Sequence, residues 1–448
     1  MIKTFVNAWK IPELRKKILF TALIILIFRI GSVIPVPFVD IGKEGILGGD
    51  YAGTFLQYLN MMTGEAFSYG TLFAMSITPY INSSIIMQLL TVAIPALERL
   101  SKEGEEGRKK IATITRYVTV LLALMQSTAY YFFLRNGSYL SLSADGVAYT
   151  GFWAVLQALT IILCFTAGAA LIMWLGEQIN DKGIGNGISM ILFAGIVSRI
   201  PTMLANLFSP EVGYWRYGGA YYVLAPLVVV IMLLMIAYIV WMDNAERRIP
   251  VQYAKRVVGR KMYGGQSTHI PIKVNMSGVM PIIFASSILS LPPTIQLFVK
   301  NPSDGWKKFF EVFTADHWAY GIMYFFLIIF FAYFYATIQY NPIEMANNIR
   351  KNSGAIPGIR PGKPTSDYIG KILSRITLLG ALLISVVAIF PILYSQICGL
   401  DILQKFIPNG MNISLGGTSI IILVGVALET VKQLESQMMM RHYKGFLD

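Results

Sequence analysis

The chain contains ten apolar stretches, each about as long as a helix that crosses a lipid bilayer. The hydrocarbon core of a bilayer is about 30 Å thick and requires roughly 20 apolar residues per helix. The stretches lie near residues 18–37, 71–94, 115–134, 152–175, 185–204, 217–242, 275–299, 318–340, 372–397 and 415–437. Only 14% of all residues are charged, whereas soluble domains have about 25%. The sequence therefore predicts an all-α polytopic membrane protein with ten transmembrane helices.

The distribution of Lys and Arg predicts how these helices are oriented. Ten spans leave both termini on one side of the membrane, and that side carries 28 of the 37 basic residues. Cytoplasmic loops close to the ends of spans carry the excess of Lys and Arg. We therefore expect a multi-pass protein whose two termini are cytoplasmic.

Two pairs of similar segments suggest an internal repeat. Residues 79–84 (Pro-Tyr-Ile-Asn-Ser-Ser) resemble 281–286 (Pro-Ile-Ile-Phe-Ala-Ser), and residues 187–192 (Gly-Ile-Ser-Met-Ile-Leu) resemble 417–422 (Gly-Thr-Ser-Ile-Ile-Ile). In each pair the two spans run in opposite directions, as expected for inverted repeats, which place a transport site between two halves. Chance similarity between apolar helices is the alternative. The predicted halves are residues 1–210 and 211–448, with five spans each.

Aliphatic residues occupy matched positions within these repeated segments. Ile81 corresponds to Ile283, and Leu192 corresponds to Ile422, on helices otherwise rich in Ser, Thr, Asn and Gly. An apolar ring offers water no hydrogen bonds and tends to dewet, so four such side chains meeting centrally would seal a pore. An ordinary core or contact with lipid is the alternative.

The second and seventh spans have polar faces. Interhelical hydrogen bonds in membranes contribute about 0.6 to 2 kcal/mol each, so a helix boundary joined by one or two of them could open at modest cost. Alternatively, these hydrogen bonds could hold the helices together permanently. The polar residues are Asn82, Ser83, Ser84 and Gln88 in the second span, and Asn275, Ser277, Ser286 and Ser287 in the seventh.

Three segments outside the spans are also candidates for function. Residues 53–70 form an apolar segment too short to cross the membrane, which suggests either a surface helix or an element folded back into the protein. The cytoplasmic loops at about 243–273 and 341–375 are long, basic and punctuated by Gly and Pro. Loops of this kind usually bind a partner, and a basic surface suits RNA, an acidic protein or anionic lipid.

The sequence argues against enzyme chemistry and against ion-coupled transport. The segment 358–365 has the wrong glycine spacing for a phosphate-binding loop, and the three histidines are too scattered for a metal site. We predict no catalytic residue, no cofactor and no metal. Coupled transporters generally need ionisable groups at mid-depth, whereas Arg29 and Glu429 are among the few charged residues in these spans. An inverted-repeat secondary transporter of a small solute remains the alternative function.

Several longer motifs resemble the SecY/Sec61-alpha family of protein-conducting channels, and the resemblance covers essentially the whole chain. The motifs are residues 28–32 (Phe-Arg-Ile-Gly-Ser), 79–90, 103–111 (Glu-Gly-Glu-Glu-Gly-Arg-Lys-Lys-Ile), 174–189, 266–275 (Gln-Ser-Thr-His-Ile-Pro-Ile-Lys-Val-Asn), 357–362 (Pro-Gly-Ile-Arg-Pro-Gly) and 416–419 (Gly-Gly-Thr-Ser). The resemblance implies a channel that moves unfolded preproteins across the bacterial cytoplasmic membrane and releases transmembrane segments sideways into lipid. It also implies an hourglass pore between the two halves.

The resemblance further implies roles for particular residues. Leu192 stands where the family leads us to expect isoleucine, and it keeps the position apolar. The expected pore ring comprises Ile77, Ile81, Ile188, Leu192, Ile283 and Ile422, and the expected plug comprises Leu59, Met62, Gly64 and Phe67 within the segment 53–70. The expected lateral gate lies between spans two and three and spans seven and eight, with Ser83, Ser84, Gln88, Asn275, Ser286 and Ser287 along it.

The resemblance implies partners as well. SecE and SecG would accompany the channel, and the SecA ATPase or the ribosome would drive translocation. Signal sequences, whose apolar cores are short, would enter between the gate helices. The residues expected to bind SecA or the ribosome are Arg248, Lys255, Arg256, Arg260 and Arg360.

Overall fold

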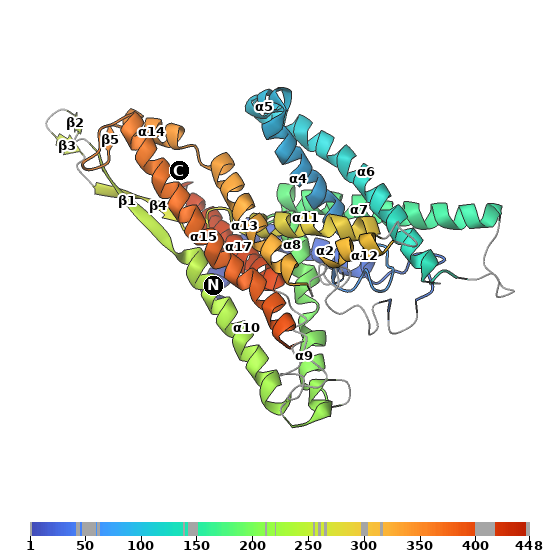
Figure 1. Cartoon of the computed structure of the whole chain (residues 1–448). Coiled ribbons are helices and arrows are strands. Elements are labelled where there is room, and N and C mark those ends of the chain that lie inside the picture. The colour runs from blue at the N-terminus through green and yellow to red at the C-terminus, as the bar shows by residue number, and fades with distance from the viewer. Residues whose placement is uncertain are drawn as a thin grey trace.

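The computed structural model of the chain is predominantly helical (Figure 1). It describes residues 2–41, 45–46, 60, 63–137, 139–141, 151–210, 213–219, 221–253, 256–258, 261–263, 267–296, 303–313, 317–398 and 417–444. Within this part of the chain five short strands form two small sheets beside the helices.

The helices of the first part of the chain begin where the sequence supplies the expected signals. Proline is favoured in the first turn of a helix, where its missing N–H is not needed, and it opens α2, α4 and α5. Asn186 caps α8, its side chain accepting from the backbone N–H groups of Ile188 and Ser189. The helices are α1 (Ile2–Lys10), α2 (Pro12–Gly31), α4 (Thr78–Ala93), α5 (Pro95–Lys102), α6 (Glu105–Asn136), α7 (Phe152–Lys182), α8 (Gly187–Val197) and α9 (Ile200–Phe208).

The second part of the chain continues with the 3-10 helix η1 (Tyr214–Tyr217) and seven α-helices among the described residues. Asn341 caps α14 in the same way as Asn186 caps α8. The helices are α10 (Tyr221–Asn244), α11 (Met280–Gln296), α12 (Asp304–Glu311), α13 (Trp318–Gln339), α14 (Pro342–Lys351), α15 (Lys363–Cys398) and α17 (Gly417–Lys444).

The fold class predicted from the sequence is confirmed, and a helix coincides with each of the ten predicted spans. In the described part of the chain seven helical segments are long and apolar enough to cross a bilayer by themselves, and α4 with α5 makes an eighth bent by 101°. Two others fall short for identifiable reasons. The helix α2 carries five charged residues in its 20 positions, and α11 has only 17 residues.

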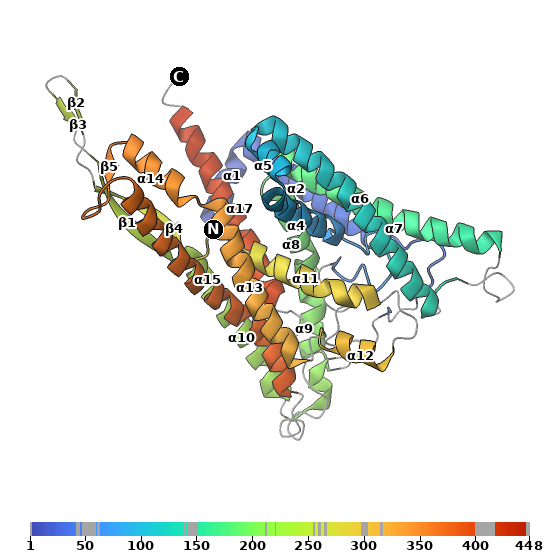
Figure 2. The ribbon, with the colours of Figure 1, turned by 45° about the horizontal axis from the view of Figure 1, so that its top comes forward.

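The helices form two groups with α8 between them (Figure 2). Helices α10, α13, α15 and α17 pack together in one group, and α4, α6 and α7 pack together in the other. A single apolar cluster runs through both groups and includes Phe73, Ile172, Ile239 and Phe331. The helix α1 packs against α17, and Thr4 Oγ1 donates a hydrogen bond to Glu435 Oε1 at 3.0 Å. The two ends of the chain therefore lie on the same side of the bundle.

The first basic loop contains β-structure, which the sequence analysis did not predict. The strands β1 (Glu246–Tyr253) and β4 (Ser267–Lys273) pair antiparallel, and β5 (Gly354–Ala355) adds to β1 from the second loop. A smaller sheet joins β2 (Arg256–Val258) to β3 (Lys261–Tyr263). The buried residues Ile249 and Val251 alternate with exposed neighbours, which is the pattern of a strand with one covered face. The two basic loops therefore form one folded unit.

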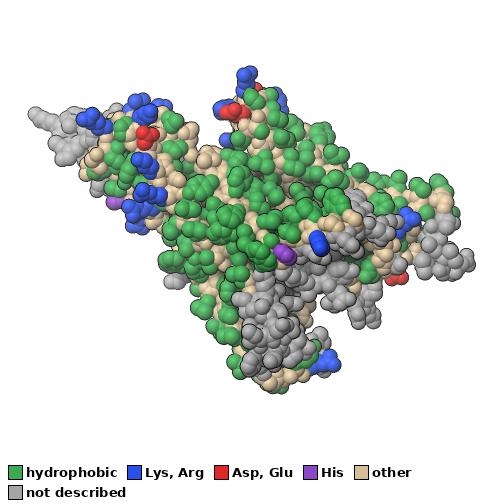
Figure 3. Space-filling view, in the orientation of Figure 1, with side chains coloured by type: hydrophobic (Ala, Val, Ile, Leu, Met, Phe, Trp, Pro, Cys, Tyr) green, Lys and Arg blue, Asp and Glu red, His purple; other side chains and the backbone are tan. Residues whose placement is uncertain are grey.

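The surface separates into an apolar body and charged ends. In Figure 3 most of the visible Lys and Arg side chains lie on the tips around α14 and α5, whereas hydrophobic side chains cover the body between them. The exposed apolar residues include Leu23, Leu121, Val230, Trp241, Phe326 and Val386. Exposed apolar area on this scale suits contact with lipid rather than with water.

Candidate pore and gate

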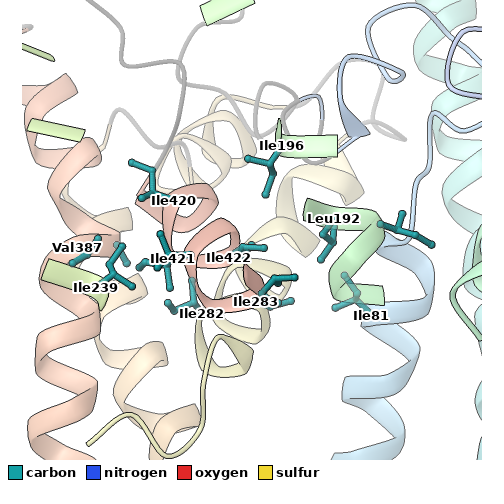
Figure 4. Close-up of a cluster of buried hydrophobic side chains, with 14 of the residues drawn as sticks. Ile81, Leu192, Ile196, Ile239, Ile282, Ile283, Val387, Ile420, Ile421 and Ile422 are labelled. Carbon is teal, nitrogen blue, oxygen red and sulfur yellow. The ribbon is translucent and has the colours of Figure 1, made fainter. Parts of the chain in front are cut away.

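Four helices bring the matched aliphatic residues together at the centre of the bundle. Ile81 on α4, Leu192 on α8, Ile283 on α11 and Ile422 on α17 are all buried, with exposed fractions between 1% and 6%, and they belong to one cluster. Figure 4 shows Ile283 and Ile422 facing Leu192 and Ile81. The four residues form an apolar contact region that contains no charged side chain among them.

The remaining two residues of the predicted ring lie in the same cluster. Ile77 is buried at the N-cap of α4, and Ile188 is half-buried in the first turn of α8. The helix α4 begins at Thr78, later than the predicted span, because residues 72–77 form turns. Ile77 therefore approaches these four residues from a turn. That all six residues form a pore ring stays a prediction.

A cavity of about 930 Å³ with a partly polar lining lies against this apolar cluster. Ile283 and Ile422 are part of its lining, whereas Asn180, Asn186 and Ser189 form polar parts of its wall. Pro271 and Lys273 of β4 also line it, so the cavity lies on the side of the basic loops. The cavity therefore places polar side chains directly beside the apolar cluster.

Asn275 fixes the segment between β4 and α11 to one wall of the cavity. Its Nδ2 donates to Asp243 Oδ1 at 3.2 Å, and Lys432 Nζ pairs with Asp243 Oδ2 at the same distance. The Oδ1 atom of Asn275 is buried and has no hydrogen-bond partner within the described chain. The resemblance placed both Asn275 and Gln88 along the lateral gate, but Asn275 bonds to Asp243 on α10, within its own half of the chain.

Gln88 does bridge the two groups of helices, with a partner that the sequence analysis missed. Tyr335 Oη on α13 donates to Gln88 Oε1 on α4 at 2.8 Å, and Gln88 Nε2 donates to Ser84 Oγ at 3.4 Å. The Tyr335 ring also packs against Phe284 on α11, with 5.2 Å between the ring centroids. One tyrosine thus connects α4, α11 and α13.

The serines assigned to the gate make bonds of a different kind. Ser83 shares a 2.5 Å hydrogen bond with Thr119, which joins α4 to α6 inside the first group. Ser286 donates to the Ile283 carbonyl of its own helix at 2.9 Å, and the Ser287 carbonyl accepts from Ser290. Ser83 therefore acts as attachment between neighbouring helices, which was the alternative that the sequence left open.

The described part of the outer segment is folded into the protein rather than laid on its surface. Thr63, Ala66 and Phe67 are buried, and residues 64–70 form turns. The Tyr130 hydroxyl donates to the Phe67 carbonyl. Two residues of the predicted plug, Leu59 and Met62, lie outside the described residues.

One arginine holds this segment, and a second lies beside it. Arg199, between α8 and α9, pairs with Glu65 at 3.3 Å, whereas Arg29 Nη1 on α2 donates to Ser198 Oγ, the residue next to Arg199, at 2.9 Å. Gly64 has φ +63°, and a Cβ built there would lie 2.9 Å from Arg29 Nη1. Glycine is required at this position because it combines a left-handed backbone with close approach of a side chain. Glu65 has φ 75°, so it adopts a conformation that non-glycine residues rarely take.

The expected docking residues are only partly described. Arg248 on β1 is exposed and pairs with Glu246 at 2.7 Å. Arg360 is exposed in the turn before α15, where its carbonyl accepts from Thr365 Oγ1 at 2.9 Å. Lys255 and Arg260 lie outside the described residues, as does the side chain of Arg256. The described residues contain no group of three or more His, Cys, Asp or Glu side chains that could hold a metal ion.

The fold and the site together define a class, a polytopic membrane protein with a buried apolar cluster beside a partly polar cavity. Comparison with known proteins gives the family. The SecY family model matches residues 71–431. The protein translocase subunit SecY of Streptomyces galbus is 42% identical over 462 residues, and that of Mycobacterium tuberculosis is 42% identical over 461, each with complete coverage of both chains. The chain therefore belongs to the SecY family.

Solved structures support the same fold. A structure described as a protein conducting channel has a TM-score of 0.64 at 17% identity and covers 96% of each chain. Sec61 in the canine ribosome-channel complex has a TM-score of 0.60 at 16% identity, with the same coverage. Family membership identifies a role in protein translocation, and it decides against both a small-solute transporter and an enzyme.

Proposed function

We propose that the chain forms a gated pore through which unfolded preproteins cross the membrane. The convergence of Ile81, Leu192, Ile283 and Ile422 beside the polar cavity is the observation that carries this proposal. An aliphatic neck has no fixed hydrogen-bonding groups, so it can close without ions passing and can fit around many side chains of a moving polypeptide. The segment that contains Gly64 and Phe67 covers the neck as a plug.

We further propose that apolar segments leave sideways between α4 with α6 and α11 with α13. Gln88 and Tyr335 join the two sides of this gate by one hydrogen bond, whose net contribution in membranes is about 0.6 to 2 kcal/mol. The apolar core of a signal sequence is too short to span the membrane alone. Entry of that core between the gate helices replaces the Gln88–Tyr335 contact with apolar burial and opens the gate.

Location and partners complete the proposal. The excess of Lys and Arg around α14 and α5 favours a cytoplasmic location for that face of a bacterial inner-membrane protein. The contact between α1 and α17 supports placing both termini on one side. We propose SecE and SecG as companions, inverted halves at residues 1–210 and 211–448, and docking of SecA or the ribosome on the loops with Arg248 and Arg360. Canine Sec61 and yeast Ssh1, which share the fold, were solved with ribosomes.

A crosslinking experiment tests the pore. Single cysteines replace Ile81 and Ile283 in a background from which Cys164 and Cys398, the chain's two cysteines, have been removed. A secreted chain with its own cysteine is then stalled during translocation. We expect disulfides from both positions to the stalled chain, because both side chains line the proposed neck. Phe326, 64% exposed on α13, provides a lipid-facing control.

The outcome of this experiment is decisive in either direction. Crosslinks at Ile81 and Ile283, together with none at Phe326, support the pore. A verified stalled chain that reaches neither position places the translocation path elsewhere. Docking is tested separately with Arg360→Glu, which we expect to reduce SecA-driven export while thermal unfolding stays the same. Export at the native rate would remove Arg360 from the docking surface.

A further inference from the structure

The connection between α11 and α13 contains a short amphipathic helix, α12, to which the proposed function assigns no role. Aromatic residues recur there at the spacing i, i+3, i+4 and i+7, which places them along one face of a helix. They are Trp306, Phe309, Phe310 and, in the turn that follows, Phe313. Lys308 and the other charged residues of α12 fall at helical positions away from this face.

The aromatic face divides into an inner and an outer pair of residues. Phe310 is only 2% exposed, and Phe313 packs against the main apolar cluster of the bundle. Trp306 and Phe309 are instead 54% and 50% exposed. Each outer ring contacts an inner ring, with 5.6 Å between the centroids of Trp306 and Phe310 and 5.2 Å between those of Phe309 and Phe313. The inner pair therefore fixes α12 to the bundle, and the outer pair faces away from it.

A hollow of about 430 Å³ lies beside the outer pair. Its lining consists of Ser303, Gly305, Trp306 and Phe309. A Cβ built at Gly305 would meet no atom within 4 Å, so the hollow is open at this residue. A hydroxyl beside two half-exposed aromatic rings is the composition of a surface that lies between water and hydrocarbon.

The neighbouring helices place α12 at the membrane surface opposite the basic loops. The helix α11 begins shortly after β4 and ends at Gln296, whereas α13 begins at Trp318 and returns toward α14 and β5. In Figure 2, α12 lies near the end of the bundle that is farther from the strands. The ends of membrane helices lie at the level of the lipid headgroups, where tryptophan is enriched. Trp318 is 66% exposed, as expected at this level.

We propose that α12 lies flat in the membrane leaflet opposite the basic loops, with Trp306 and Phe309 inserted among the phospholipids and Lys308 at the level of their phosphates. A helix with aromatic residues on one face and lysine on the other binds in the interfacial plane, with its apolar face buried by about 5 to 10 Å. Insertion removes the two rings from water. The occupant of this face is the bilayer and not a second protein, because the flanking ends of α11 and α13 already hold α12 at the depth of the headgroups.

This placement gives α12 a role at the proposed gate. The helices α11 and α13 form one side of that gate, and α12 lies in the connection between them. An anchor in the interfacial plane keeps the connected ends at one depth, so the two helices can move sideways within the membrane but do not slide along its normal. The location of α12 rests on its own residues, whereas this consequence rests on the proposed function.

Spin labels on the full chain in phospholipid vesicles test the location. A single cysteine replaces Gly305 or Lys308 in a chain from which Cys164 and Cys398 have been removed. Power saturation then measures collisions of the label with oxygen, which concentrates in the bilayer, and with a nickel chelate, which stays in water. We expect a high ratio of oxygen to nickel collisions at Gly305, whose label enters the hollow, and a low ratio at Lys308.

A matched pair of variants assigns this depth to the aromatic face. Burial of the exposed half of one aromatic side chain favours insertion by about tenfold. Trp306→Gln should therefore lower the ratio at Gly305 toward the value at Lys308. Trp241→Gln makes the same change at a tryptophan that is 64% exposed on α10, and it should leave the ratio at Gly305 unchanged.

Three results would overturn the proposal. Equally low ratios at Gly305 and Lys308 would place α12 in water. A label at Gly305 that neither reagent reaches would show that protein covers the hollow. A ratio that Trp306→Gln leaves unchanged would remove the aromatic face as the anchor. The measurement uses the resting channel without preprotein, so its failure is distinct from failure of the pore crosslinks at Ile81 and Ile283.

Discussion

The neck of the proposed pore and the contacts around it are built from opposite kinds of interaction. At the neck, Ile81, Leu192, Ile283 and Ile422 meet through apolar surface alone. Around it, directed polar contacts join separate elements, including Glu65 to Arg199 and Gln88 to Tyr335. Apolar contact has no preferred direction, whereas a hydrogen bond weakens steeply when its geometry is lost.

This difference assigns a separate task to each region. The neck can reseal around whatever passes through it, because aliphatic side chains fit many shapes and hold no water. The polar contacts cannot adapt in that way, so each is either made or broken. We infer that the neck determines how tightly the channel is sealed, and that the polar contacts determine how often it opens. The three predictions below separate these two effects.

The largest effect is expected at the neck itself. Replacing Ile81 and Ile283 together with Ser removes two buried aliphatic side chains, and burial of each contributes about 1.5 to 3 kcal/mol. At the lower limit the closed neck loses about 3 kcal/mol, so ion leakage through the resting channel should rise about a hundredfold. Conductance of proteoliposomes without preprotein or SecA measures this leak.

The control for this prediction is Val230→Ser, which makes a similar change at a half-exposed, lipid-facing position on α10. It should leave the leak at the native level. An unchanged leak in the double neck variant would show that the apolar ring is not the seal, and the barrier would then have to lie in the covering segment. The neck would then not determine how tightly the channel is sealed.

The sequence predicted the apolar features well, because long apolar stretches and matched aliphatic positions are visible without structure. The ten spans coincide with helices, and the predicted ring residues fall in one cluster. The strands β1 and β4 were not predicted. In β1 only Ile249 and Val251 are buried, and the residue between them is a proline, which is rare inside strands, so the alternation is a weak signal.

Polar partners were not predictable from the sequence. Tyr335 lies 247 residues from Gln88, and Ser198 lies 169 residues from Arg29. A polar residue on an apolar helix shows that a partner is needed, but many side chains could supply it. Asn275 illustrates the limit, since the sequence indicated a polar contact but not its partner, which in the structure is Asp243 on α10. Only the packing of the helices decides such a choice.

The contact between Glu65 and Arg199 should give the intermediate effect. Glu65→Gln leaves the neck intact but removes the carboxylate that faces Arg199, whose Nη1 is already buried without a partner in the described chain. A partly exposed ion pair contributes about 1 kcal/mol, so resting leakage should rise about fivefold, far less than in the neck variant. The same proteoliposome conductance provides the measurement.

Charge exchange provides the control for this pair. The double variant Glu65→Arg with Arg199→Glu should bring the leak back toward the native level, because it keeps the attraction and reverses only its direction. Leakage that is as high in the exchanged variant as in Glu65→Gln would mean that the surrounding turn, rather than the ion pair, holds the segment. Glu65 would then contribute through the backbone conformation of the turn and not through its carboxylate.

The smallest effect is expected at the gate, and it should differ in kind as well as in size. Tyr335→Phe removes the hydroxyl that Gln88 accepts from and keeps the ring packed against Phe284. A bond of this type contributes about 0.6 kcal/mol in membranes, which corresponds to roughly a threefold change. Crosslinking of a signal peptide between α4 and α13 should therefore become about three times more frequent, while resting leakage stays native. Gln88→Ala should give the same result, since it removes the other partner. If either variant raised leakage as much as Glu65→Gln does, the gate and the outer segment would act as one unit, and the separation of sealing from opening would not hold.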